Sequence, residues 1–374
     1  KLQPIMKRYD AIDLGFDWDR RLNLPAVVET VMICSGIVSF VLHPFFIAVV
    51  IRNRASLSRT IVYSQTALAL SMWIHDIYCL LLYRPYLLLP LPALLCNGPI
   101  CQAGFNGKTL LVVLIFLLNI MPLPTITVLL KAQRGARNNR NPRMLERRKW
   151  AIIGLLVSII AANVVLYRLF GHHNKHYPRL FEKHSLSWVT DSNTSVLVLG
   201  KGVGHLGSFE IAVIYSAITI ACLFPLALWL VCGTVKELQA HQNSLVRTTT
   251  KVVTKRVSAN LIVQLLEACV FYILPQTLSA ALLLLPVSVL KLLPTVAFPL
   301  LRVFVLLLFT FHSQVCTILL LIRTPTYRKY LQAKLLNAKV SFSSKDIKEA
   351  LVDQGSDQVV VRITSTQMDD QVFV

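Results

Sequence analysis

The sequence predicts an all-α integral membrane protein, a bundle of seven transmembrane helices with its N-terminus outside the cell and its C-terminus inside. Three observations support this fold class: hydrophobic residues make up 55% of the 374 positions, charged residues make up 15%, and the mean hydropathy is +0.61. A soluble domain carries about 25% charged residues, so this chain has too few charges to cover a water-facing surface. We therefore expect one domain in a lipid bilayer.

Seven apolar segments are long enough to cross the bilayer, because about 20 residues of α-helix span its hydrocarbon core and satisfy their own backbone amides there. They are residues 25–51, 61–89, 108–130, 150–170, 208–232, 259–285 and 297–322. The expected organisation is an extracellular N-terminal segment (1–24), the seven-helix bundle (25–322), an amphipathic juxtamembrane helix (323–338) and a disordered cytoplasmic tail (339–374).

Positive charge predicts the orientation of the bundle, since Lys and Arg residues are retained on the cytoplasmic side. The first, third and fifth connections, together with residues 323–334, hold twenty Lys and Arg residues, and the other connections hold fewer. The sequon at Asn193 lies in the 171–207 connection, on the predicted outer side, and is a candidate for glycosylation. Membrane orientation accounts for the net charge of +20, and no nucleic-acid partner is expected.

Four patches, in order along the chain, resemble the nematode serpentine chemoreceptors of the Str superfamily, most like class H. They are LHPFFIAVVI at 42–51, Trp73-Ile-His-Asp76 with Pro85-Tyr86 and the proline-rich run to Gly98, the segment from Gln264 to Pro286, and Phe309-Thr-Phe-His312-Ser with Tyr327-Arg328. The Asp-Arg-Tyr and Asn-Pro-x-x-Tyr motifs of rhodopsin-like receptors are absent from the sequence.

This resemblance implies a GPCR-like chemosensory receptor. Such a receptor binds a small extracellular molecule between the outer helix halves and signals through its cytoplasmic loops to a heterotrimeric G protein. It also implies a place in the plasma membrane, in the cilia of sensory neurons. The alternative is a seven-helix transporter of 3+1+3 architecture, which is suggested by the similarity of the Leu- and Pro-rich runs at 87–95 and 282–294.

Charged and aromatic residues within the spans are the candidates for ligand binding, because a charge inside lipid costs several kcal/mol unless it is paired or hydrated. Asp76 is the strongest candidate, since it lies near the middle of the second span; the alternative is that it holds helices together by hydrogen bonds. The full set of ligand-binding candidates is Trp73, His75, Asp76, Tyr78, Glu29, Glu210, Tyr272, Gln276 and Arg302. Of these, Glu29, Glu210 and Arg302 lie near the outer interface, where a charged side chain also reaches water.

Other residues are candidates for a conformational switch. Pro225 and Pro275 remove backbone donors inside the fifth and sixth spans and should kink them. Glu267 and His312, together with His43, lie in the inner halves of their spans, where hydrogen bonds between helices can differ between two packings.

A third set of residues is basic or aromatic and lies on the predicted cytoplasmic side, where it can contact a G protein or anionic lipid. The set comprises Arg52, Arg54, Arg134, Arg137, Arg140, Lys255, Arg256, Tyr327 and Arg328. Cys96 and Cys101 flank a short outer connection, so either a local disulfide or two free thiols are consistent with the sequence. We find no metal site, cofactor motif or catalytic motif, and we do not expect an enzyme.

Overall fold

The computed structural model describes residues 13–56, 59–121, 123–124, 126, 142–170, 181, 186–190, 195–199, 208–244, 262–263, 266–267 and 269–334. The chain forms two compact units, residues 1–324 and residues 325–374. In the second unit, residues 325–334 are helical. All elements named below belong to the first unit.

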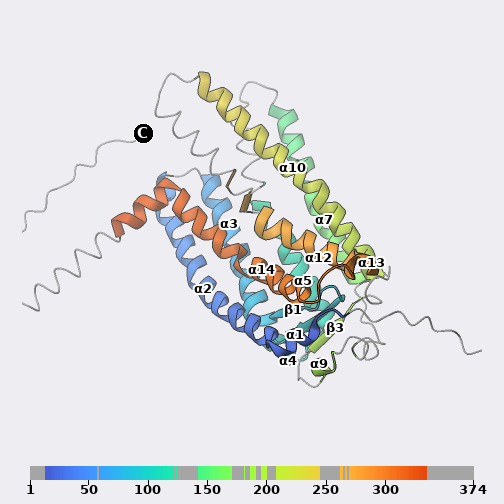
Figure 1. The fold of residues 1–374 in the computed structure, drawn as a ribbon. Coiled ribbons are helices and arrows are strands. Elements are labelled where there is room, and N and C mark those ends of the chain that lie inside the picture. The colour runs from blue at the N-terminus through green and yellow to red at the C-terminus, as the bar shows by residue number, and fades with distance from the viewer. Residues whose placement is uncertain are drawn as a thin grey trace, which may run out of the picture. The chain divides into compact units, whose positions relative to one another are not determined.

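The long helices correspond one to one with the seven predicted spans (Figure 1). They are α2 (Leu24–Arg52), α3 (Arg59–Asp76) with the π-helix η2 (Ile77–Tyr83), α5 (Gly107–Ile120), α7 (Pro142–Phe170), α10 (Ser208–Ser244), the π-helix η3 (Cys269–Ile273) with α12 (Leu274–Leu284), and α14 (Ala297–Arg323). Shorter helices are α1 (Phe16–Arg21), η1 (Arg54–Ser56), α4 (Pro99–Gln102), α9 (Ser187–Thr190) and α13 (Val287–Leu290).

Length and hydropathy identify membrane-crossing segments among these helices. Within the described residues, four stretches are long and apolar enough to span a membrane: Leu24–Arg52, Ile61–Tyr83, Trp150–Phe170 and Ala297–Arg323. Shorter apolar helices cover Gly107–Ile120, Phe209–Thr219 and Cys269–Leu284. The exposed faces of the long helices carry large apolar side chains, such as Val41 of α2 at 66% exposure and Tyr63 of α3 at 74%. These faces suit lipid rather than water.

α14 is the most buried of the four membrane-length helices among the described residues. In its most apolar window 61% of residues are buried, whereas the corresponding share for α7 is 11%. α14 contacts α2, α3, η3 and α12, while α7 lies between α5 and α10 (Figure 1). α14 thus packs against several helices, whereas most of the apolar stretch of α7 is not buried within the described bundle.

A small β-sheet is the main departure from the predicted all-α architecture. Strands β1 (Pro85–Leu87), β2 (Ala93–Cys96) and β3 (Ser195–Val198) pair antiparallel in that order. The second span was expected to continue to residue 89, but the helix ends at Tyr83. The residue before a proline disfavours helical backbone, and Arg84, which precedes Pro85, adopts a positive φ of 47°. The chain consequently leaves the helix and forms a hairpin.

The sheet joins two connections that are distant in sequence. β1 and β2 lie between η2 and α5, whereas β3 precedes α10. The register pairs Leu95 with both Tyr86 and Val196, so backbone hydrogen bonds hold these connections together. Cys96 at the end of β2 forms a disulfide with Cys101 of α4, and their Cα atoms are 6.0 Å apart.

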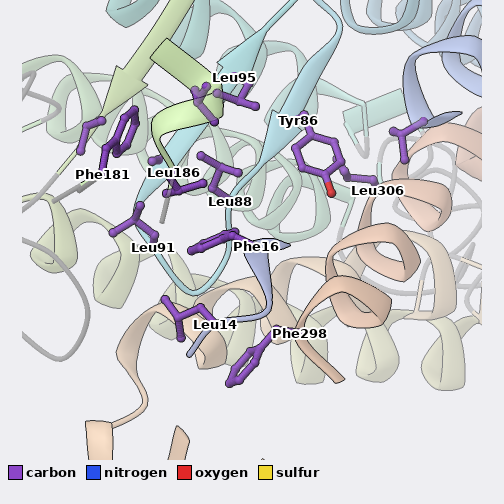
Figure 2. Packing of buried hydrophobic residues seen from close by; sticks show 14 of the residues in the cluster. Leu14, Phe16, Tyr86, Leu88, Leu91, Leu95, Phe181, Leu186, Phe298 and Leu306 are labelled. Atoms are coloured by element: carbon purple, nitrogen blue, oxygen red, sulfur yellow. The ribbon is translucent and has the colours of Figure 1, made fainter. Parts of the chain in front are cut away.

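A hydrophobic core lies beside the sheet and includes residues from the N-terminal segment. Leu14 and Phe16 are 2% and 1% exposed, and they belong to the same cluster as Leu88, Leu91 and Phe298. Figure 2 shows Phe16 among the side chains of the hairpin and of the start of α14. The segment before the first span is thus packed onto the bundle from residue 14 onward, because its apolar side chains complete this core.

Gly98 allows the chain to turn closely past the end of η2. A Cβ atom at this position would overlap the carbonyl oxygens of Leu82 and Tyr83, whereas a Cβ at Gly154 in α7 would meet nothing within 4 Å. We predict that Gly98→Ala lowers the free energy of unfolding by roughly 1–3 kcal/mol, as overpacking does elsewhere. The apparent melting temperature of the purified protein should therefore fall, with Gly154→Ala as the matched control. Equal melting temperatures for the two variants would contradict the close approach.

Candidate functional site

A cavity of about 420 Å³ lies within the described bundle. Its lining comes from α2, α3, η2, α5, α7, α10, α12 and α14, and most lining side chains are apolar. The β1–β2 hairpin contributes Leu87, Leu89 and Leu91, together with the residues up to Leu94. This hairpin connects the end of η2 with α5, so it forms the cavity wall at that end of the bundle. The volume falls in the range of roughly 300–1,000 Å³ that is typical of small-molecule pockets.

The cavity includes only some of the predicted ligand-binding residues. His75 and Gln276 line it. Trp73, Asp76 and Tyr78 lie behind or beside the lining and are not part of it. The side chain of Tyr272 lies outside the described residues.

Asp76 is the centre of a buried polar network between α2, α3 and α14. Its Oδ2 lies 3.1 Å from Nε2 of His43 and accepts a hydrogen bond from the Ser313 hydroxyl, and its Oδ1 lies 3.2 Å from Nδ1 of His75. Thr317 extends the network, since its hydroxyl lies 3.1 Å from Nδ1 of His43. All five side chains are buried. The network connects three helices to His75, which is the member that reaches the cavity.

A second set of hydrogen bonds holds α14 against α2. Nε2 of Gln314 donates to the backbone oxygen of Ser35 at 2.8 Å and to the Ser39 hydroxyl at 2.9 Å, and it also contacts the Ser35 hydroxyl. Sequence reasoning missed Gln314, although a buried amide in an apolar span requires partners of this kind.

Glu267 and His312 contact each other in the cavity wall. Oε1 of Glu267 lies 2.9 Å from Nδ1 of His312, and both side chains line the cavity. This pair joins the helix that carries Glu267 to α14. Of the predicted kink residues, Pro275 is buried at the junction of η3 with α12, whereas Pro225 is exposed within α10. The π-helix η3 ends two residues before Pro275, and Pro275 has no N–H to donate to a backbone hydrogen bond.

Arg302 is fully buried, contrary to the expectation that a side chain at this level reaches water. Its guanidinium lies 2.7 Å from Oδ2 of Asp19 and donates to the carbonyl oxygens of Leu14 and Leu89 at 3.1 and 2.7 Å. It also lies 4.5 Å from the ring centre of Phe16. The ion pair therefore fastens the N-terminal segment and the hairpin to α14, because a buried cation requires such partners.

Burial raises the pKa of the Asp19 carboxyl, and the charge and hydrogen bond of Arg302 oppose that shift. The guanidinium beside the carboxyl stays protonated and favours its charged form. Sequence reasoning did not select Asp19 as a candidate site residue. The signal that could have identified it is the cation at Arg302, which needed an acidic partner from a neighbouring segment.

Comparison with known proteins identifies the family. The model of the family "Serpentine type 7TM GPCR chemoreceptor Sri" matches residues 21–331. The chain belongs to this Sri family. The seven-helix membrane fold that the sequence predicted is thereby confirmed, as is the resemblance to nematode-type serpentine chemoreceptors. The protein is a multi-pass membrane protein of a receptor family and not of an enzyme family. The match is to Sri and does not extend to class H. No curated protein matches the chain.

Several other predicted residues of this Sri-family chain make contacts near the hairpin end of the bundle. Glu29 accepts hydrogen bonds from Arg84 at 2.7 Å and from Asn97 at 3.1 Å. The Tyr78 hydroxyl donates to the carbonyl oxygen of Leu110 at 2.6 Å. These contacts join α2, η2 and α5 to one another. Glu210, at the start of α10, is 3% exposed.

The predicted cytoplasmic contact residues are described only in part. Arg52, Arg54 and Arg328 are exposed, whereas Tyr327 is buried. Arg134, Arg137, Arg140, Lys255 and Arg256 lie outside the described residues, as does the candidate glycosylation residue Asn193. Within the described residues, no cluster of three or more metal-ligating side chains occurs.

We predict that Asp19→Asn destabilises the receptor by about 3–5 kcal/mol, because it leaves the buried Arg302 without a counter-ion. The double variant Asp19→Leu with Arg302→Leu should recover most of this loss, since apolar side chains suit the surrounding core. The measurement is the apparent melting temperature in detergent. Asp17→Asn is the control, because Asp17 lies on the exposed side of the same short helix. A double variant as unstable as the single one would exclude this explanation.

Proposed function

We propose that this Sri-family receptor binds a small extracellular molecule in its cavity and signals through its cytoplasmic loops to a heterotrimeric G protein. The observation that supports the proposal is the cavity itself, whose wall is shared by helices from every span. A ligand in such a place contacts all the helices, so it can bind one packing of the bundle more tightly than another. That differential affinity is the requirement for a ligand-driven switch.

The Asp76 network offers a route from the ligand to the helix packing. His75 lines the cavity, and its imidazole is held by Asp76, which in turn contacts α2 and α14. The Glu267–His312 pair offers a second route, since both residues line the cavity and lie on different helices. A ligand that displaces either histidine changes contacts between helices. We propose that these two sets, with Pro275 as a point of bending, form the switch.

The orientation and location of the receptor follow from the same proposal. The charge distribution supports an extracellular N-terminus and a cytoplasmic C-terminus. The cavity would then lie between the outer helix halves, beneath the hairpin. We propose that the receptor lies in the plasma membrane of sensory cilia. We also propose that, among related chemoreceptors, it is most like class H.

A transporter of 3+1+3 architecture remains the alternative function. It is distinguished by the movement of solute across the membrane, which a receptor does not require. Cells that express the chain should answer a panel of candidate odorants with an intracellular calcium signal and without uptake of the active compound. Uptake of a compound without any signal would favour the transporter.

We predict that Asp76→Asn raises the ligand concentration for the half-maximal calcium response by roughly ten-fold or more. The reason is that the His75 imidazole loses its charged partner, and a hydrogen bond to a charged group contributes about 1.5–3 kcal/mol. Ser71→Ala is the matched control, because the Ser71 hydroxyl bonds only within α3, to the carbonyl oxygen of Leu68. Surface expression is measured in parallel. A normal response of Asp76→Asn to every active ligand would contradict the proposed role.

We predict that an epitope tag at the N-terminus is labelled by antibody on intact cells, whereas a C-terminal tag is labelled only after permeabilisation. The physical basis is the odd number of spans together with the excess of Lys and Arg in alternate connections. Labelling of both tags on intact cells would contradict the seven-span topology. Labelling of the C-terminal tag alone would reverse the orientation.

A further inference from the structure

The cavity offers no partner for a net charge on its ligand. Its described lining contains neither Lys nor Arg, and its one carboxylate belongs to Glu267. That carboxylate is paired with His312 at 2.9 Å, and the lining imidazole of His75 is paired with Asp76. An ion transferred from water into this apolar space would lose its hydration without gaining a counter-ion. The electrostatics therefore select an uncharged molecule.

Three polar residues of the cavity wall lie together where α7 meets α10. The Ser216 hydroxyl lies 2.9 Å from Oδ1 of Asn163 and 3.4 Å from the Tyr167 hydroxyl, and all three residues line the cavity. Asn163 and Tyr167 are four residues apart on α7, so they lie on one face of the helix. Sequence reasoning did not select any of the three.

The chemistry of this trio suits an oxygen atom of a ligand. The Asn163–Ser216 bond uses the amide oxygen, so the amide NH₂ group of Asn163 is not consumed by it. Asn163 is 3% exposed, which means that this donor lies away from solvent and next to the cavity. A carbonyl or hydroxyl oxygen of a ligand can accept from it. By contrast, Asn119, another amide in the lining, donates within its own helix to Ile115 at 2.7 Å.

We propose that the cavity takes an uncharged, largely apolar molecule with one oxygen function, which is held by Asn163 together with Tyr167 and Ser216. This inference rests on the proposed ligand-binding function and adds to it the chemical class of the ligand and the residues that orient it. The many apolar lining residues supply most of the affinity, and the polar trio discriminates between ligands of equal size.

The test measures binding directly, on the full chain in lipid nanodiscs, with the neutral fluorescent probe 1-aminoanthracene and empty nanodiscs as background. We expect saturable binding that Ala217→Phe removes, because Ala217 lines the cavity. Ile218→Phe is the matched control, since Ile218 is 57% exposed on the outer face of the same helix. Absence of saturable binding, or equal binding by the two variants, would overturn the assignment of the cavity as a ligand site.

Four competitors of one chain length then test the class: octane, 1-octanol, octanoate and octylammonium. We expect 1-octanol to displace the probe at a concentration at least ten-fold below that of either ion. Asn163→Leu should raise the concentration of 1-octanol that displaces the probe roughly three- to ten-fold, which is the effect of losing one hydrogen bond. The displacing concentration of octane should not change. Ser216→Ala is a milder second variant, and Asn119→Leu is the control with no expected effect.

Two results would overturn the inference. The first is that either ion displaces the probe at the same concentration as 1-octanol. The second is that the ratio of the displacing concentrations of 1-octanol and octane is unchanged in both Asn163→Leu and Ser216→Ala. Because the measurement is binding, its outcome is separate from that of signalling. A receptor that binds 1-octanol as expected but gives no calcium response to any ligand would contradict the proposed function and leave the ligand class standing.

Discussion

Hydrocarbon contains no water, so charged and polar side chains within the spans must find their partners in other parts of the protein, and the packing of this receptor depends on that constraint. Three buried contacts illustrate it: the Arg302–Asp19 ion pair and the contacts of His43 with Asp76 and of His312 with Glu267. α14 supplies one residue of the first and third pairs, and its Ser313 bonds to the second. The deep burial of α14 agrees with this requirement, because the helices that satisfy its polar groups pack against it.

The same requirement explains how the hairpin end of the bundle is closed. The buried Arg302 guanidinium needs hydrogen-bond acceptors and a negative charge. It donates to carbonyl oxygens of the hairpin and of the N-terminal segment, and it pairs with the Asp19 carboxylate. Backbone pairing of β2 with β3 and the Cys96–Cys101 disulfide hold the surrounding connections. The apolar core around Phe16 then excludes water from the buried ion pair. Closure at this end and burial of the charge thus support each other.

The cavity combines this closed end with a wall that is mostly apolar. Shape and dispersion contacts give such a site its affinity, whereas a few polar groups give it discrimination. Two groups of polar side chains in the wall are the trio on α7 and α10 and the histidines that contact Asp76 and Glu267. One group suits recognition of the ligand and the other suits coupling to helix packing, so a small molecule that contacts both can link binding to a change of packing.

The sequence by itself determined the solvent of this protein, its seven spans and the unusual residues within them, because each span is defined by its own composition. Asp76, Glu267 and Arg302 stood out for the same reason. Tertiary structure decided their partners and the sheet. An apolar run such as residues 85–96 does not distinguish strand from helix by its periodicity, and its pairing with 195–198 depends on a distant segment. The Asn163 trio likewise arises only from the contact of two helices, so no local pattern could indicate it.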